Sequence, residues 1–145
     1  MIVIGRRDYI DLPEFDLTKI QAKIDTGAYG CSLHCHEIAI DVIHGRETLK
    51  FKLLDPQHPE YEDKYICTTE FNDIIVKNSS GQTEHRYTIR TNIVLFATVY
   101  DVEFSLADRE QMRYPILLGR KFLRNRFIVD VAHKNVSRKI KKRTK

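Results

Sequence analysis

The architecture of this chain depends on the stretch Ile24-Asp25-Thr26-Gly27-Ala28, which places a carboxylate on a sharp turn. Before the turn, the apolar residues Ile20, Ala22 and Ile24 alternate with polar residues. This period of two is the pattern of a β-strand with one buried face, and it predicts a strand over residues 17–24. The stretch therefore predicts a carboxylate presented at the end of a strand.

Three residues of the turn have an expected role. Gly27 is predicted to take backbone angles that are closed to other residues. Ala28 leaves room for a close neighbour, and the Thr26 hydroxyl is expected to bond inward and steady the turn. An Asp that only caps the turn is the alternative explanation of the same pattern.

A second stretch, far downstream, complements the first. It reads Pro115-Ile116-Leu117-Leu118-Gly119-Arg120, an apolar run that ends in Gly-Arg and enters a helix. Together the two stretches resemble the active-site half of a retropepsin-type aspartic peptidase. The chain is also similar to the retropepsin-like proteins named ATP-dependent zinc proteases, through residues 4–7, 9, 12–14, 22–28, 33–34, 113–127 and 129–130. It departs from them at Tyr29-Gly30-Cys31, where members often carry Arg-Thr-Ser.

The resemblance implies a role for each part of the site. Asp25 would be catalytic, Leu118 would belong to the core, Gly119 would permit close backbone packing, and Arg120 would form an ion pair near a subunit contact. Aspartic peptidases need two carboxylates about 3 Å apart that share one proton. This sequence contains a single Asp-Thr-Gly. A homodimer that joins two half sites across a two-fold axis is therefore expected.

The rest of the chain is dominated by extended segments. Alternating apolar and polar residues predict strands over residues 38–42 and 49–53, with a hairpin turn at His44-Gly45 between them. Residues 85–93 are predicted to be another strand, and residues 94–104 a further β-rich segment. Only residues 120–126 have a helical pattern. We therefore expect an all-β fold, which the resemblance makes a closed β-barrel of the retropepsin (acid protease) type with one short helix.

Charge divides the chain into two parts. Of the 145 residues, 24 are basic and 20 are acidic, which gives a net charge of +4. Residues 133–145 hold seven of the basic residues and none of the acidic ones, so residues 1–132 carry 17 basic and 20 acidic residues. We expect residues 1–132 to form one domain and residues 133–145 to be a flexible basic tail. The tail lacks interleaved aromatic residues, so nucleic-acid recognition is not expected.

The cysteines and the apolar content indicate a cytoplasmic protein. Cys31, Cys35 and Cys67 are an odd number without the spacing of a disulfide framework, which fits a reducing compartment. No stretch approaches the ~20 apolar residues of a membrane span, and the first residues lack the apolar region of a secretory signal. We therefore expect a cytoplasmic location and no membrane partner.

A metal site is the alternative chemistry. Cys31, His34 and Cys35 are potential zinc ligands that lie close together in sequence. On a strand, however, Cys35 points away from the neighbouring histidines, and the Cys-x-x-Cys and His-Glu-x-x-His spacings are missing. We therefore expect no metal and no cofactor. The sequence also lacks a phosphate-binding Gly-Lys-Ser/Thr loop, so an ATP requirement would belong to a partner such as an ATP-grasp ligase.

The predicted function is hydrolysis of peptide or amide bonds by a dyad of Asp25 side chains across a homodimer. Two alternatives remain open: a retropepsin-fold binding or regulatory protein that docks on an ATP-grasp ligase without catalysis, and a metal-dependent peptidase. A flap over the cleft is expected around residues 54–65 or 77–84, where turn residues interrupt the strands. The sequence alone assigns no substrate.

Overall fold

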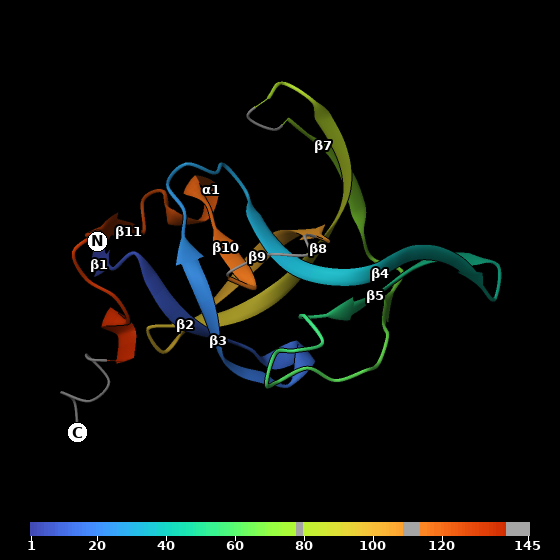
Figure 1. Cartoon of the computed structure of the whole chain (residues 1–145), viewed down its shortest axis with the longest axis horizontal. Helices are drawn as coiled ribbons and strands as arrows, with labels where there is room; N and C mark the ends of the chain where they lie inside the picture. The colour runs from blue at the N-terminus through green and yellow to red at the C-terminus, as the bar shows by residue number, and fades with distance from the viewer. Residues whose placement is uncertain (78–79, 109–113, 139–145) are drawn as a thin grey trace.

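The computed structural model describes residues 1–77, 80–108 and 114–138, which fold mainly into β-strands (Figure 1). The strands are β1 (Ile2–Ile4), β2 (Arg7–Leu12), β3 (Leu17–Ile24), β4 (Cys31–Ile43), β5 (Arg46–Leu53), β6 (Ile66–Thr68), β7 (Asn72–Lys77), β8 (Thr83–Leu95), β9 (Thr98–Ala107), β10 (Ile116–Leu118) and β11 (Phe127–Val129). Helical segments of the described chain include the 3-10 helix η1 (Pro13–Phe15), the short helix α1 (Arg120–Leu123) and residues 136–138. The all-β class predicted from the sequence is confirmed.

The strands around the Asp25 turn pair in a ring. The main sheet has the order β10-β3-β2-β8-β9-β4-β5-β6, and β10 also pairs with β4. β10 is parallel to β3 and antiparallel to β4. Because residues 25–30 connect β3 to β4, β10 fixes both ends of the segment that carries the catalytic candidate. β1 and β11 form a separate parallel pair.

The strands bury their apolar faces in one core. Along β2, the buried residues Asp8, Ile10 and Leu12 alternate with half-buried ones, as expected for a strand with one inner face. Phe51 of β5 and Phe104 of β9 are fully buried in the same core. Burial of an apolar side chain of this size contributes about 1.5–3 kcal/mol. The core thus holds β3, β9 and β10 in fixed positions beneath the site.

Two long hairpins, β4–β5 and β7–β8, extend from the ring (Figure 1). A third hairpin joins β8 to β9, and its turn interrupts the β-rich segment predicted over residues 94–104. Phe96 and Ala97 form its turn with φ angles of 52° and 56°. Neither residue type favours positive φ. The Phe96 ring packs beside Phe127 with a centroid distance of 5.9 Å, so tertiary packing stabilises this turn.

Helix α1 is shorter than the predicted range of residues 120–126. Arg124 has an extended ψ of 131° and Asn125 has a φ of 63°, so helical hydrogen bonding stops after one turn. No helix in the described ranges is long and apolar enough to cross a membrane.

Residues 133–138, which the sequence prediction assigned to the tail, contact β2. The fully buried carboxylate of Asp8 accepts hydrogen bonds from the Ser137 N–H over 3.1 Å and from the Ser137 hydroxyl. Ser137 is also buried. The remaining tail, residues 139–145, lies outside the described residues.

Candidate active site

The turn at Asp25 is fixed by main-chain hydrogen bonds to the second predicted stretch. The Asp25 N–H donates to the Leu118 carbonyl over 2.9 Å, where β3 and β10 end together. On the other side of Gly119, the Arg120 N–H donates to the Ala28 carbonyl over 2.9 Å. The two stretches therefore meet in space and form one structural unit.

Gly119 is the point where the two stretches come closest. A Cβ atom at this position would lie 2.2 Å from the Gly30 carbonyl oxygen and 2.8 Å from the Ala28 carbonyl oxygen. Both are main-chain atoms, so a larger residue would require the turn to move. The φ angle of Gly119 is −93°, which any residue can adopt. The fold therefore requires glycine at this position because glycine has no side chain, and not because it can adopt unusual backbone angles.

Gly27 differs from the sequence prediction. The φ angle of Gly27 lies outside the left-handed region, so the predicted special backbone angles are wrong. Instead, the Gly27 N–H donates to Asp25 Oδ1 over 3.0 Å, and a Cβ atom on Gly27 would lie 3.2 Å from the same oxygen. Thr26 contributes its main-chain carbonyl, which accepts a hydrogen bond from Arg120 Nη1 over 3.0 Å.

Arg120 supports the turn within one chain. Besides its bond to the Thr26 carbonyl, its guanidinium lies over the Tyr29 ring, 5.9 Å from the centroid. Both contacts hold the exposed side of the turn against the start of α1. The ion pair near a subunit contact stays a prediction.

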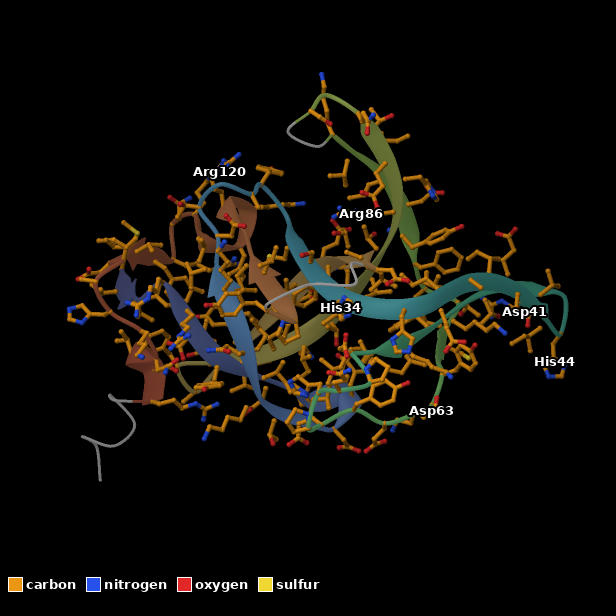
Figure 2. All side chains as sticks on the ribbon, in the orientation of Figure 1. His34, Asp41, His44, Asp63, Arg86 and Arg120 are labelled. Atoms are coloured by element: carbon orange, nitrogen blue, oxygen red, sulfur yellow. The ribbon has the colours of Figure 1, made fainter. Side chains whose placement is uncertain are left out.

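Asp25 is half-buried and lines a groove of ≈ 1130 Å³. Arg120, at the start of α1, and Arg86, on β8, both line this groove and are labelled in Figure 2. Its volume exceeds the ~300–1,000 Å³ of a typical small-molecule site, so it has room for several residues of a peptide. The charged side chains along it are Lys77, Arg86, Arg90, Arg120, Lys121, Arg126, Asp25, Asp101 and Glu103.

The groove has an excess of positive charge, because six of these side chains are basic and three are acidic. Arg90 pairs with Asp101 over 3.2 Å, and Lys121 approaches Glu103 to 3.8 Å. A third basic group, Arg86, pairs with Glu84 over 3.1 Å. The other basic groups of the groove, Lys77, Arg120 and Arg126, still outnumber the remaining acidic group, Asp25. A cleft lined by one sign of charge concentrates ligands of the opposite sign. The groove is therefore suited to an anionic ligand.

One of the two predicted flap positions lies beside the groove. Lys77 ends β7 at the turn of the β7–β8 hairpin and lines the groove, which fits the range 77–84. Residues of the other range, 54–65, line a separate small cavity together with Phe15 and Leu17. The β7–β8 hairpin thus lines the same groove as Asp25.

The cysteine and histidine cluster is buried. The Cys31 sulfur accepts a hydrogen bond from the Gly119 N–H over 3.4 Å, and burial raises the pKa of Cys31 to about 11. Burial also raises the pKa of Cys35 well above its usual range, and its thiol donates to the Leu33 carbonyl. Metals bind the thiolate, which both sites disfavour. Within the described ranges, no group of three His, Cys, Asp or Glu side chains, including His34, is arranged to hold a metal ion.

Strand β8 supplies groove residues that the sequence prediction did not select. Arg86 and Thr88 are buried and line the groove together with Arg90. Their alternation with Tyr87 and Ile89 places the three on one face of the strand. Alternation alone does not tell whether the polar face of a strand meets solvent or a ligand site. The sequence pattern was therefore insufficient to identify these three residues as part of a site.

Comparison with known proteins places these features in context. A family model described as RimB-like, the retropepsin-like aspartic endopeptidase RimB, matches residues 3–140. The chain is 34% identical over 134 residues to a probable alpha-L-glutamate ligase of Desulfotalea psychrophila and 32% identical over 133 residues to one of Parasynechococcus marenigrum. These matches cover 90% and 89% of the chain, which spans only 28% of the length of each relative.

A solved structure shares the fold. The crystal structure of Lpg0085 from Legionella pneumophila, described as a protein of unknown function, superimposes with a TM-score of 0.73 and 27% identity. The match covers 94% of this chain and 98% of that one.

Proposed function

Because this chain belongs to the RimB-like family of retropepsin-like aspartic endopeptidases, we propose that it hydrolyses peptide bonds with an active site shared by two copies of the chain. The observation that carries the proposal is the position of Asp25 on a clamped turn beside a large basic groove. A clamped turn suits catalysis, because a misplacement of about 1 Å can cost about 100-fold in rate. We assign the ring of paired strands to the closed barrel of the retropepsin type.

The mechanism requires a second carboxylate, which we infer to be Asp25 of another copy across a two-fold axis. Two carboxylates about 3 Å apart share one proton, because they cannot both ionise. The ionised one removes a proton from the attacking water, while the protonated one donates its proton to the substrate carbonyl oxygen. Transfer of a proton to the leaving nitrogen then lets the C–N bond break.

We infer that the substrate is an acidic peptide. The excess of basic side chains in the groove would attract carboxylates and raise the association rate at low salt. The names of the relatives, probable alpha-L-glutamate ligases, agree with this inference, because glutamate is acidic. A neutral groove would offer no such preference.

The β7–β8 hairpin is the proposed cover of the bound peptide. Ile74 and Ile75 are apolar yet 39% and 70% exposed, and both line the groove. A peptide lying between this hairpin and Asp25 would bury them, which gains about 25 cal/mol for each Å² of apolar surface removed from water.

Cleavage of a fluorogenic glutamate-rich peptide tests the proposal. Asp25→Asn should abolish cleavage, and a statine peptide should inhibit the wild-type protein because its hydroxyl mimics the tetrahedral transition state. Strong chelators should leave the rate unchanged. Loss of the rate on chelation, followed by recovery with zinc, would contradict the proposal and transfer the chemistry to Cys31, His34 and Cys35.

A second candidate function is a non-catalytic domain that regulates a glutamate ligase. It is favoured by the names of the relatives, in which a segment similar to this chain makes up 28% of the protein. The Asp25→Asn variant separates the two candidates. A regulatory domain would keep its effect on the ligase in this variant, whereas a peptidase would lose its own activity.

A further inference from the structure

Three buried polar atoms without a hydrogen-bond partner lie along the groove: Arg86 Nε, Thr88 Oγ1 and Ser32 Oγ. Their residues are 8%, 1% and 7% exposed, respectively. Buried polar atoms in folded proteins nearly always have a partner, because an unpaired one carries a desolvation penalty. Three such atoms along one groove therefore indicate a site for a polar ligand.

The strand register aligns the hydroxyls in a row. Thr88 of β8 is opposite Ser105 of β9, and Ser105 is opposite Ser32 of β4. Residues directly opposite one another in a sheet point to the same face, so the three hydroxyls cross three strands side by side. Ser32 is in turn opposite Leu117 of β10, the strand that holds the Asp25 turn. The row therefore runs from β8 toward the catalytic carboxylate.

Arg86 lies at the β8 end of this row. It precedes Thr88 by two residues and so shares its face of the strand. Its Nη2 donates to Glu84 over 3.1 Å, while Nε remains without a partner. The Glu84 side chain is 54% exposed, so this ion pair can open to solvent. Guanidinium groups bind carboxylates through two parallel N–H bonds. In Arg86, Nε is a free donor that can form one of these two bonds beside Nη2.

We propose that Arg86 binds a carboxylate of the substrate, and that the Thr88 and Ser32 hydroxyls bind the peptide main chain between that carboxylate and Asp25. The inference rests on the proposed function and adds a specificity-determining residue to it. Without substrate, the Glu84 carboxylate pairs with Arg86. The substrate carboxylate then takes the place of the Glu84 carboxylate when it binds. That carboxylate belongs either to an acidic side chain or to the C-terminus of the peptide, since both present the same two oxygens.

Peptide binding to the Asp25→Asn protein tests this inference without requiring catalysis. Fluorescence anisotropy compares one sequence carrying Glu or Gln, each with a free or an amidated C-terminus. The Glu peptides should bind about 10- to 100-fold tighter if Arg86 binds a side chain, and the free C-termini should bind tighter by this factor if it binds the terminus. Arg86→Gln should remove the difference. Glu84→Gln should strengthen binding of the favoured peptide, because it removes the internal competitor.

Matched variants separate recognition from general charge and from folding. Arg46→Gln removes one exposed positive charge beside His44, at the far end of the β4–β5 hairpin (Figure 2), and should preserve the difference. Thr88→Val should weaken all four peptides alike. If Arg86→Gln does not fold, Arg86→Lys keeps the charge without the two-pronged geometry and should reduce the preference.

The outcomes distinguish this inference from the proposed function. It is overturned if Arg86→Gln weakens all four peptides equally, if Arg46→Gln has the same effect, or if no peptide binds. Carboxylate-dependent binding that Arg86→Gln removes, without cleavage by the wild-type protein, would support the binding role of Arg86 and reject the peptidase. Cleavage without any carboxylate preference would support the peptidase and reject the binding role of Arg86.

Discussion

The main-chain nitrogen of Asp25 lies 2.9 Å from the carbonyl oxygen of Leu118, and this hydrogen bond fixes the catalytic candidate relative to β10. Asp25 directly follows β3 and Leu118 ends β10, so the parallel pairing of the two strands positions the turn. Gly119 then lets the chain pass close to Gly30. Changes at this crossing should therefore affect stability and site geometry together.

Replacing Gly119 by Ala should destabilise the protein by about 2–3 kcal/mol, because the new Cβ atom would lie 2.2 Å from the Gly30 carbonyl oxygen. Gly30→Ala is the matched control. A Cβ atom on Gly30 has no neighbour within 4 Å, so this change should shift the free energy of unfolding by less than about 0.5 kcal/mol. Urea unfolding measures both, and equal stabilities would contradict the close approach at Gly119.

Alkaline pH should destabilise the protein through the thiol of Cys31. Burial raises the pKa of this thiol from 9.0 to about 11. Below pH 9 the thiol is protonated in both states; between pH 9 and 11 the unfolded chain releases the proton while the folded chain retains it. The free energy of unfolding therefore falls as pH rises through this window, by at most about 1.4 kcal/mol per pH unit.

Two cysteine variants check this effect by urea unfolding across the same window. Cys31→Ala should show a shallower decline than Cys67→Ala, because the Cys67 thiol is exposed. Parallel declines would mean that the Cys31 thiol ionises as readily in the folded state as in the unfolded one.

Local signatures explain which features could be predicted from the sequence. The Asp25 turn and Gly119 each lie in a short motif, so it could be predicted from the sequence that the two are close in space. The row of Thr88, Ser105 and Ser32 was not, because the register between strands distant in sequence leaves no trace in a single chain. Gly27 was given the wrong role since its residue type permits unusual angles but does not require them.

The proposed dyad predicts a bell-shaped dependence of the cleavage rate on pH. Catalysis requires one carboxylate protonated and one ionised, so the rate falls when both are protonated and again when both are ionised. In acid-adapted enzymes the upper of the two apparent pKa values is about 4.7. We expect the falling limb to lie above about pH 4.7, because apolar walls and the like charge of the second copy raise the upper value. A rate that climbs steadily to high pH would instead indicate a metal hydroxide or a thiolate.

Subunit mixing determines whether two copies build one site. Wild-type and Asp25→Asn chains are mixed in equal amounts and left until subunit exchange is complete, which differently labelled subunits verify. The Asp41→Asn chain is the control, because Asp41 is exposed on the β4–β5 hairpin and pairs only with Lys50 over 3.6 Å among the described residues (Figure 2). Mixing with this control should leave the activity unchanged.

The activity of the mixture with Asp25→Asn, relative to the same total amount of wild-type protein, is the decisive quantity. Random pairing makes about one quarter of the dimers fully wild-type, so the activity should fall to about one quarter if both Asp25 carboxylates are required. An activity of about one half, with exchange verified, would mean that each chain acts independently and that Asp25 does not form a site shared by two copies.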